Sequence, residues 1–275
     1  MLILYAVVFP IVGLLLLLSL VYLLILVRPA KKIKPDPALL CDYAHRGLHG
    51  DGIPENSKAA FDRACEQGHG IELDVQLSRD GVVMVFHDAK LGRMTGREGK
   101  LCDYTADELC TMTLADSEET VPTFAEVLAL VDARVPLLVE LKGESTDTAL
   151  CPKVADLLRD YKGIYCIESF NPLLLGEMKK HLPNAFRGML YTNVCREKKK
   201  RSLLNLLLTA MALNVIAKPD FIAYNQVYRA SLPVRLTTKF YGAPHFVWTT
   251  RGECERKIAR SLGEHAIFEL YEKNK

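Results

Sequence analysis

The chain has 275 residues, of which 49% are hydrophobic and 25% are charged. This composition is typical of a globular protein and excludes extensive disorder. The formal net charge of +2 is too small for a domain-wide basic face, so we expect no nucleic acid among the partners.

The N-terminal residues 1–28 are predicted to form a transmembrane anchor. No charged side chain occurs before Arg28, and the stretch is rich in leucine. It therefore exceeds the roughly 20 apolar residues that span a bilayer. A cleaved signal peptide is the alternative, but its apolar core has only about 7–15 residues and follows a positive charge. We favour the anchor on both criteria.

A basic, proline-containing linker, residues 29–40, follows this anchor. Positive charge comes directly after the apolar stretch, on Arg28, Lys31, Lys32 and Lys34. Basic flanks are retained on the cytoplasmic side of a membrane. We therefore expect a single-pass membrane protein whose catalytic domain, residues 41–275, faces the cytoplasm, held close to the lipid surface by the short stiff segment 35–37.

Beyond the linker, short apolar runs alternate with helix-like segments, as expected of βα units around a parallel sheet. Eight runs are candidate strands: residues 43–46, 71–75, 137–141, 164–169, 187–191, 221–224, 246–249 and 266–270. We predict an α/β fold, a (β/α)8 TIM-type barrel of ordinary size for one domain. Thr105 with Glu108, and Thr123 with Glu126, have capping-box spacing and predict two helix starts.

One connection departs from the alternation. Ser78-Arg79-Asp80-Gly81 is a tight turn, whereas parallel neighbours need a crossover of about a dozen residues. Residues 82–86 must therefore run antiparallel, as the returning arm of a small β-hairpin insertion. This arm would carry His87 back toward the carboxyl end of the second barrel strand.

Three carboxylates are placed where strands end. Glu72 and Asp74 lie two apart on one predicted strand and share the face that points into the barrel, and Glu140 has the same alternation on another strand. Three convergent buried carboxylates without a cation carry a prohibitive desolvation cost. We therefore predict that they bind a hard divalent cation, Mg²⁺ or Ca²⁺.

Two histidines and two basic residues accompany these carboxylates. His45 and His87 titrate near neutrality, so one can accept a proton from the nucleophile while the other donates to the leaving oxygen. Arg46 and Lys142 offer positive charge to the non-bridging oxygens of a phosphodiester. A plain salt bridge between Glu140 and Lys142 is the simpler alternative for that pair. Asn56 is interpreted structurally, as the cap of the helix that starts at Ser57.

The motifs resemble those of the glycerophosphodiester phosphodiesterase family, in order and spacing, from about Tyr43 to Thr250. They are His45-Arg46-Gly47, Pro54-Glu55-Asn56-Ser57, Glu72-Leu73-Asp74-Val75, Asp80-Gly81, His87-Asp88 and Glu140-Leu141-Lys142. The resemblance implies hydrolysis of glycerophosphodiesters to an alcohol and sn-glycerol 3-phosphate. It also implies that Phe170 and Trp248, at later strand ends, line the substrate cleft.

Two departures from the family pattern leave alternatives open. The last strand, 266–270, lacks the usual Thr-Asp-x-Pro-like turn, so we expect it to be degenerate. The basic run 196–201 leads into a long apolar segment, 202–217, which we interpret as a barrel helix, with contact to the bilayer interface as the alternative. The corresponding alternative functions are lysophospholipase D activity on membrane lipids and a catalytically silent, membrane-tethered binding module.

Overall fold

The structure, a computed structural model, describes residues 2–30, 34–143 and 145–270. Within this part of the chain, eight parallel strands close into a barrel, because β1 pairs with both β2 and β9. The barrel strands are β1 (Tyr43–Ala44), β2 (Gly70–Leu77), β4 (Leu137–Leu141), β5 (Tyr165–Ser169), β6 (Phe186–Tyr191), β7 (Phe221–Asn225), β8 (His245–Arg251) and β9 (His265–Glu269). The predicted TIM-type barrel is confirmed, with all eight strands at the predicted places.

The ninth strand, β3 (Val83–Val85), pairs antiparallel with β2 beyond the barrel. The turn between them is closed by a hydrogen bond from Gly81 N to Ser78 O (3.0 Å), and Gly81 has a φ of +78°, which a residue without a Cβ adopts at little cost. The predicted hairpin insertion is therefore confirmed.

The last strand is not degenerate, and this corrects the prediction. Tyr43 and Ala44 of β1 are in register with Ile267 and Phe268 of β9, and the backbone N–H of His45 donates to Phe268 O at 2.8 Å. Closure of the barrel depends on this backbone pairing and on the buried apolar side chains of the strand. The turn expected after the strand is not needed for either.

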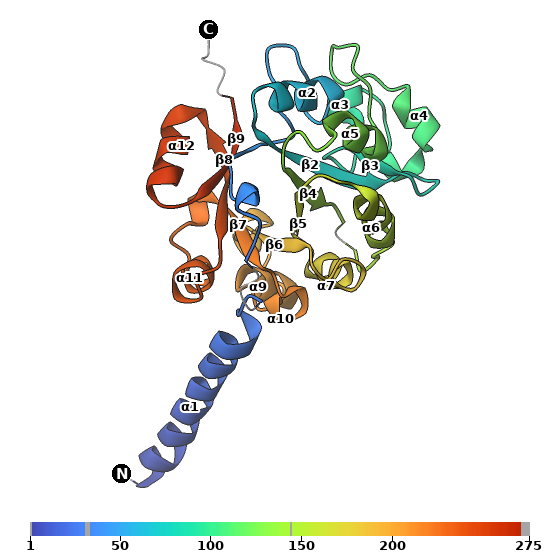
Figure 1. Ribbon diagram of the computed structural model, residues 1–275. Coiled ribbons are helices and arrows are strands. Elements are labelled where there is room, and N and C mark those ends of the chain that lie inside the picture. Colours follow the sequence, from blue (N-terminus) through green and yellow to red (C-terminus); the bar gives the residue numbers. More distant parts are fainter. Residues whose placement is uncertain (1, 31–33, 144, 271–275) are drawn as a thin grey trace.

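Helices cover the outside of the barrel (Figure 1). The predicted capping boxes at Thr105 and Thr123 are both present, at the starts of α4 and α5. The helices after α1 are α2 (Lys58–Glu66), α3 (Gly92–Thr95), α4 (Ala106–Cys110), α5 (Phe124–Val131), α6 (Leu150–Asp160), α7 (Pro172–His181), α8 (Val194–Glu197), α9 (Leu203–Thr209), α10 (Asn214–Ala217), α11 (Leu232–Arg235) and α12 (Gly252–Ser261). Segment 202–217 is thus two short helices, separated at Met211, which has a φ of +50°.

The N-terminal helix α1 (Leu2–Val21) continues as a π-helical turn, Tyr22–Leu26, and stands away from the barrel in Figure 1. Its segment Val7–Leu26 has a mean hydropathy of 2.8 and is long and apolar enough to cross a membrane. A signal sequence near an N-terminus has the same properties.

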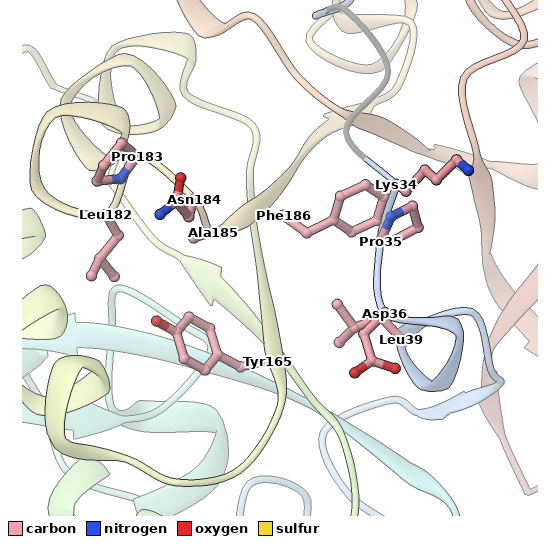
Figure 2. A pocket seen from close by; sticks show the side chains of 10 residues that line it. All are labelled: Lys34, Pro35, Asp36, Leu39, Tyr165, Leu182, Pro183, Asn184, Ala185 and Phe186. Carbon is pink, nitrogen blue, oxygen red and sulfur yellow. The ribbon is translucent and has the colours of Figure 1, made fainter.

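Residues 34–39 of the linker lie near the amino-terminal ends of β5 and β6. Between these residues and the α7–β6 connection lies a hollow of about 340 Å³, lined by Lys34, Pro35, Asp36, Leu39, Tyr165, Leu182, Pro183, Asn184, Ala185 and Phe186. Figure 2 shows the linker side chains on one side of it and those of 182–185 on the other, with the Phe186 ring beside Pro35. Tyr165 and Phe186 are the first residues of β5 and β6, so this hollow is at the end of the barrel opposite to the carboxyl ends.

Candidate active site

The site is built at the carboxyl ends of β1, β2 and β4, where loops of a TIM-type barrel carry function. Strand alternation separates two sets of side chains. Ile71, Leu73 and Val75 belong to the main apolar core, so Glu72 and Asp74 point the other way, into the barrel. A second apolar cluster that includes Leu138, Phe186, Phe221 and Phe246 closes the barrel interior below them.

Glu72, Asp74 and Glu140 form one cluster. One carboxylate oxygen of each lies within 4.8 Å of the others, and all three residues are buried. Register explains this, because Asp74 of β2 is the direct neighbour of Glu140 of β4. Lys142 Nζ lies 2.8 Å from both Asp74 Oδ1 and Glu140 Oε1, and Arg46 Nε lies 3.6 Å from Asp74 Oδ2. The salt bridge between Glu140 and Lys142, given above as the simpler alternative, is thus present, but within a larger cluster.

The electrostatics of this cluster show an excess of negative charge. Burial, together with the charges of Asp74 and Glu140, raises the pKa of Glu72 well above its usual value. Burial also raises the pKa of Glu140 to about 7, although Lys142 opposes the shift. Only Asp74 has a lowered pKa, because Lys142, His87 and Arg46 outweigh the effect of its burial. The two fixed cations therefore stabilise one of the three carboxylates as an anion.

A divalent cation fits this donor set. The three side chains offer hard oxygen ligands, which Mg²⁺ and Ca²⁺ prefer, and two of them are hard to ionise without added positive charge. Binding a cation would remove the penalty that raises their pKa values. Among the described residues, this is the one group of acidic, histidine or cysteine side chains with the proximity that a metal ion requires.

Each of the two predicted histidines is held by a carboxylate. His45 Nδ1 lies 2.8 Å from Glu269 Oε1, and His87 Nδ1 lies 2.6 Å from Asp88 Oδ1. Burial lowers the pKa of both imidazoles below the usual 6.5, although the carboxylate partner of each acts in the opposite direction. Asp74 contributes to the pKa of both rings, so both are within electrostatic reach of the acidic cluster.

A second charged network stands next to the acidic cluster. Arg46 Nη1 donates to Glu55 Oε1 at 2.7 Å, and Arg93 Nη2 donates to the same oxygen at 2.6 Å. Arg93 Nε also donates to Asp88 Oδ2 at 2.6 Å. This network connects the loop that carries Arg46 with the partner of His87. It therefore fixes the positions of one basic residue and one histidine relative to each other.

The two aromatic residues expected in the substrate cleft contact each other. The rings of Phe170 and Trp248 are 5.6 Å apart and nearly perpendicular. Phe170 follows β5, and Trp248 lies on β8 with its Nε1–H donating to Ala223 O at 3.2 Å. Phe170 is exposed, so the pair offers an apolar surface at the same end of the barrel as the carboxylates.

Asn56 does not cap α2, and this prediction was wrong. Ser57 is the cap, with its side-chain oxygen accepting from Ala60 N. Asn56 is buried, and its Nδ2 donates to Asp74 Oδ2 at 2.8 Å. Ser and Asn cap helices about equally well, so a local rule alone does not decide between neighbours. The amide instead orients a member of the acidic cluster.

Sequence reasoning also missed Glu168 and Glu269. Glu168 of β5 is the direct neighbour of Glu140 and is buried. Burial, together with the charges of Glu72 and Glu140, raises the pKa of Glu168 well above its usual value. Its position after Ile167, in the same alternation as Glu140, was the available signal. Glu269 lies in the strand that was expected to be degenerate.

A sequence model of the glycerophosphoryl diester phosphodiesterase family matches residues 45–269. A glycerophosphodiester phosphodiesterase from Caldanaerobacter subterraneus is 36% identical over 159 residues, which are 54% of this chain and 65% of that protein. One from Bacillus altitudinis is 43% identical over 107 residues, which are 36% of this chain and 43% of that protein. The matched part thus spans less than two thirds of either relative.

Solved structures share the fold. A phosphodiesterase from Oleispira antarctica, solved in complex with the product sn-glycerol-3-phosphate, has a TM-score of 0.67 and 24% identity, and the match covers 83% of this chain and 92% of that one. The barrel, the order of its motifs and the match over residues 45–269 lead to one conclusion. The chain belongs to the glycerophosphoryl diester phosphodiesterase family.

Proposed function

We propose that the chain hydrolyses glycerophosphodiesters to an alcohol and sn-glycerol 3-phosphate, with His45 and His87 as the acid and base. The observation that carries this proposal is the acidic cluster of three buried carboxylates, accompanied by two imidazoles that are each held by a carboxylate. The activity in the printed names of the relatives and the product bound by the Oleispira structure agree with it.

Glu72, Asp74 and Glu140 would hold the divalent cation, Mg²⁺ or Ca²⁺. When bound, such an ion would polarise a phosphodiester oxygen and neutralise developing negative charge. The protein keeps the ligands in place through Asn56, which donates to Asp74, and through the backbone N–H of Arg46, which donates to Glu72 Oε2 at 2.8 Å. Such supporting hydrogen bonds orient ligands and tune affinity.

The carboxylate behind each histidine decides which ring nitrogen carries the proton. The hydrogen bond from His45 lowers the pKa of Glu269 to about 2. Arg93 and His87 outweigh burial and lower the pKa of Asp88 to about 2. Both carboxylates are therefore ionised at neutral pH and accept from an Nδ1–H. A neutral ring then has Nε2 as its proton acceptor, and an imidazolium donates from Nε2.

The reaction needs one ring in each state. The ring that starts neutral accepts the proton of the nucleophile at Nε2, and the ring that starts as an imidazolium donates its Nε2 proton to the alcohol oxygen when the P–O bond breaks. Glu269 and Asp88 stabilise the positive charge on their respective rings. Arg46 and Lys142 contact the carboxylate cluster, and their positive charge would bind the non-bridging phosphate oxygens.

We assign residues 1–28 to a membrane anchor, 29–40 to the linker and 41–275 to the catalytic domain in the cytoplasm. Contacts at the end of the apolar helix support an anchor over a cleaved signal sequence. Val27 is fully buried against the barrel, and its carbonyl accepts from Asn214 Nδ2 at 2.9 Å. Cleavage would leave these barrel contacts without a partner. The basic residues after the anchor support the orientation.

Lysophospholipase D activity on membrane lysophospholipids is the second candidate. The observation in its favour is that the end of the apolar helix contacts the barrel at Tyr22 and Val27, which would keep the catalytic domain at the lipid surface. Phe170 and Trp248 offer an apolar surface for an acyl chain as well as for a small alcohol.

The test compares two substrates on the full-length protein in phospholipid nanodiscs. We expect a glycerophosphodiesterase to turn over glycerophosphocholine, with release of sn-glycerol 3-phosphate, faster than lysophosphatidylcholine. Chelation should abolish turnover, and His45→Ala or His87→Ala should lower kcat by about 10²–10⁴-fold. His181→Ala, on the outer helix α7, is the matched control and should leave kcat unchanged. Faster release of choline from lysophosphatidylcholine would favour the second candidate, and no turnover of either substrate with any divalent cation would refute both.

A further inference from the structure

Helix α9 exposes three leucines and buries a polar side chain. Leu203, Leu204 and Leu206 are 74%, 57% and 50% exposed. Asn205, between them, is only 8% exposed, and its Nδ2 donates to Lys200 O at 2.9 Å. A helix on the surface of a water-soluble domain has the reverse pattern. Three exposed leucines within four residues therefore favour an apolar environment on this side of the helix.

The end of the apolar N-terminal helix packs beside α9. Tyr22 Oη donates to Ala210 O, directly after α9, at 2.9 Å. Beyond α9, Asn214 contacts Val27, and Ala30 N donates to Pro219 O at 2.8 Å. Figure 1 shows α1 ending beside α9 and α10. The exposed leucines Leu203, Leu204 and Leu206, here called the leucine face of α9, thus belong to a helix that adjoins the segment that we place in the bilayer.

The end of the N-terminal helix also contacts Tyr241, and an exposed apolar side chain lies next to this residue. Tyr241 donates its hydroxyl hydrogen to Leu23 O. Its neighbour Phe240 is 68% exposed, and the two rings pack edge to face with centroids 4.9 Å apart. Exposed apolar side chains therefore occur on both elements that the helix end contacts, as expected where a barrel wall rests on a lipid surface.

A positively charged segment directly precedes α9. The segment 196–201, Arg-Glu-Lys-Lys-Lys-Arg, has five basic residues and is exposed throughout. Lys and Arg next to an amphipathic helix bind anionic headgroups, with about 1 kcal/mol for each residue near the surface. The basic segment would lie among the headgroups of one leaflet, and the apolar helix α9 and the end of the N-terminal helix would lie in the acyl layer beneath them.

We propose that α9 is an interfacial docking helix whose leucine face lies in the acyl region just below the headgroups of an anionic membrane. This proposal rests on the membrane anchor proposed above and adds a second contact with the same leaflet. A second contact with the leaflet would add to the affinity of the anchor and define which side of the barrel faces the lipid. Segment 194–201 follows the carboxyl end of β6, and Glu197 accepts from Tyr228 Oη at 2.7 Å. The surface that contacts the membrane therefore includes one of the loops that follow the carboxyl ends of the strands, where the active site lies.

The test places tryptophan on α9 in the full-length chain. Leu204→Trp is reconstituted in nanodiscs of phosphatidylcholine and phosphatidylglycerol, with or without brominated acyl chains, which quench tryptophan on contact. Leu262→Trp, at the end of α12, is the matched control, because Leu262 is an exposed leucine (52%) on a helix far from α1 in Figure 1. The native Trp248 signal of the parent protein is subtracted. If Leu204→Trp fails to fold, Leu206→Trp replaces it.

We expect brominated lipids to reduce the emission at position 204 at least about two-fold, because an interfacial helix lies about 5–10 Å deep, and to leave that at position 262 unchanged. Equal quenching at both positions would overturn the proposal. A blue-shifted but unquenched signal at position 204 would also overturn it, since it indicates that a second copy of the chain covers α9. Extraction of membranes with alkaline carbonate tests the anchor of the parent protein separately. Release of the protein would refute the anchor, whereas the quenching experiment refutes only the docking helix.

Discussion

Replacing one carboxylate of the acidic cluster measures how strongly the cluster binds a cation. In Glu140→Gln, the shape of the side chain is kept and one negative charge is removed. We expect affinity for Mg²⁺ and Ca²⁺ to fall on the order of 10²-fold. The reason is that a hard cation depends on ligand charge, and the cluster has only three carboxylates.

The magnitude follows from the spacing of the ligands. Their oxygens lie within 4.8 Å of one another, so a cation among them would be no farther than that from each, and opposite unit charges at this distance attract by about 3.5 kcal/mol at an effective dielectric constant of about 20. Since 1.4 kcal/mol corresponds to about tenfold in affinity, the loss of one such charge would weaken binding roughly 300-fold if nothing replaced the ligand. Water that replaces the lost ligand reduces the effect toward about 10²-fold.

Isothermal titration calorimetry of chelator-treated, full-length protein measures this change. The titration is done at pH 8, because the pKa of Glu140 is raised to about 7 by burial and the parent cluster is then largely ionised at this position. Below pH 7 the parent should bind the cation more weakly, since a proton must leave first. Glu118→Gln, at an exposed position, is the control. Equal affinities of Glu140→Gln and the parent would refute the assignment of the cluster as a cation site.

Three further substitutions test the hydrogen bonds that position the site residues and the packing inside the barrel. Glu269→Gln removes the charge that favours protonated His45, so the limb of the kcat/KM profile that reports His45 should move to lower pH. Asn56→Gly, which tolerates the observed φ of +54°, removes the amide support of a ligand and should weaken cation binding by about 10–100-fold. Gly188→Ala should lower the free energy of unfolding by about 1–3 kcal/mol or more, measured by denaturant titration, because the added Cβ lies 1.9 Å from the Phe221 ring.

Each of these predictions has a control or an outcome that would contradict it. Glu253→Gln, on the exposed side of α12, should leave the pH profile unchanged, and the same result for Glu269→Gln would remove its role. Parent-like calorimetry of the Asn56 variant would limit that amide to a structural role. Gly92→Ala, where the nearest atom is 3.7 Å away, should be neutral, and an equally neutral Gly188→Ala would contradict the described packing of the barrel interior.

The strands and the acidic cluster were predictable because both depend on alternation. Side chains two apart on a strand share a face, so Glu72 and Asp74 had to point away from Ile71 and Leu73. Parallel register then brings Glu140 beside Asp74. The hairpin was predictable for an equally local reason, since a four-residue turn cannot connect parallel neighbours.

The partners of the site residues were not predictable in the same way. Asn56 contacts a residue 18 positions away, and Glu269 contacts His45 across 224 positions. Such pairs depend on barrel closure and have no periodic signal. Segment 202–217 was ambiguous for another reason. It is apolar nearly all round, so its pattern does not say which side packs on the barrel, and the break at Met211 depends on the contacts of α10 with α7 and the helix end.

The most direct test of cation-dependent hydrolysis at this barrel mouth is phosphorus NMR of the reaction of the full-length protein with glycerophosphocholine. Chelated protein should leave the diester signal unchanged, and addition of Mg²⁺ or Ca²⁺ should convert it to that of sn-glycerol 3-phosphate. The Glu72→Gln variant should show little conversion at the same cation concentration. Equal rates of product formation with and without chelator, or in the variant and the parent, would contradict the account.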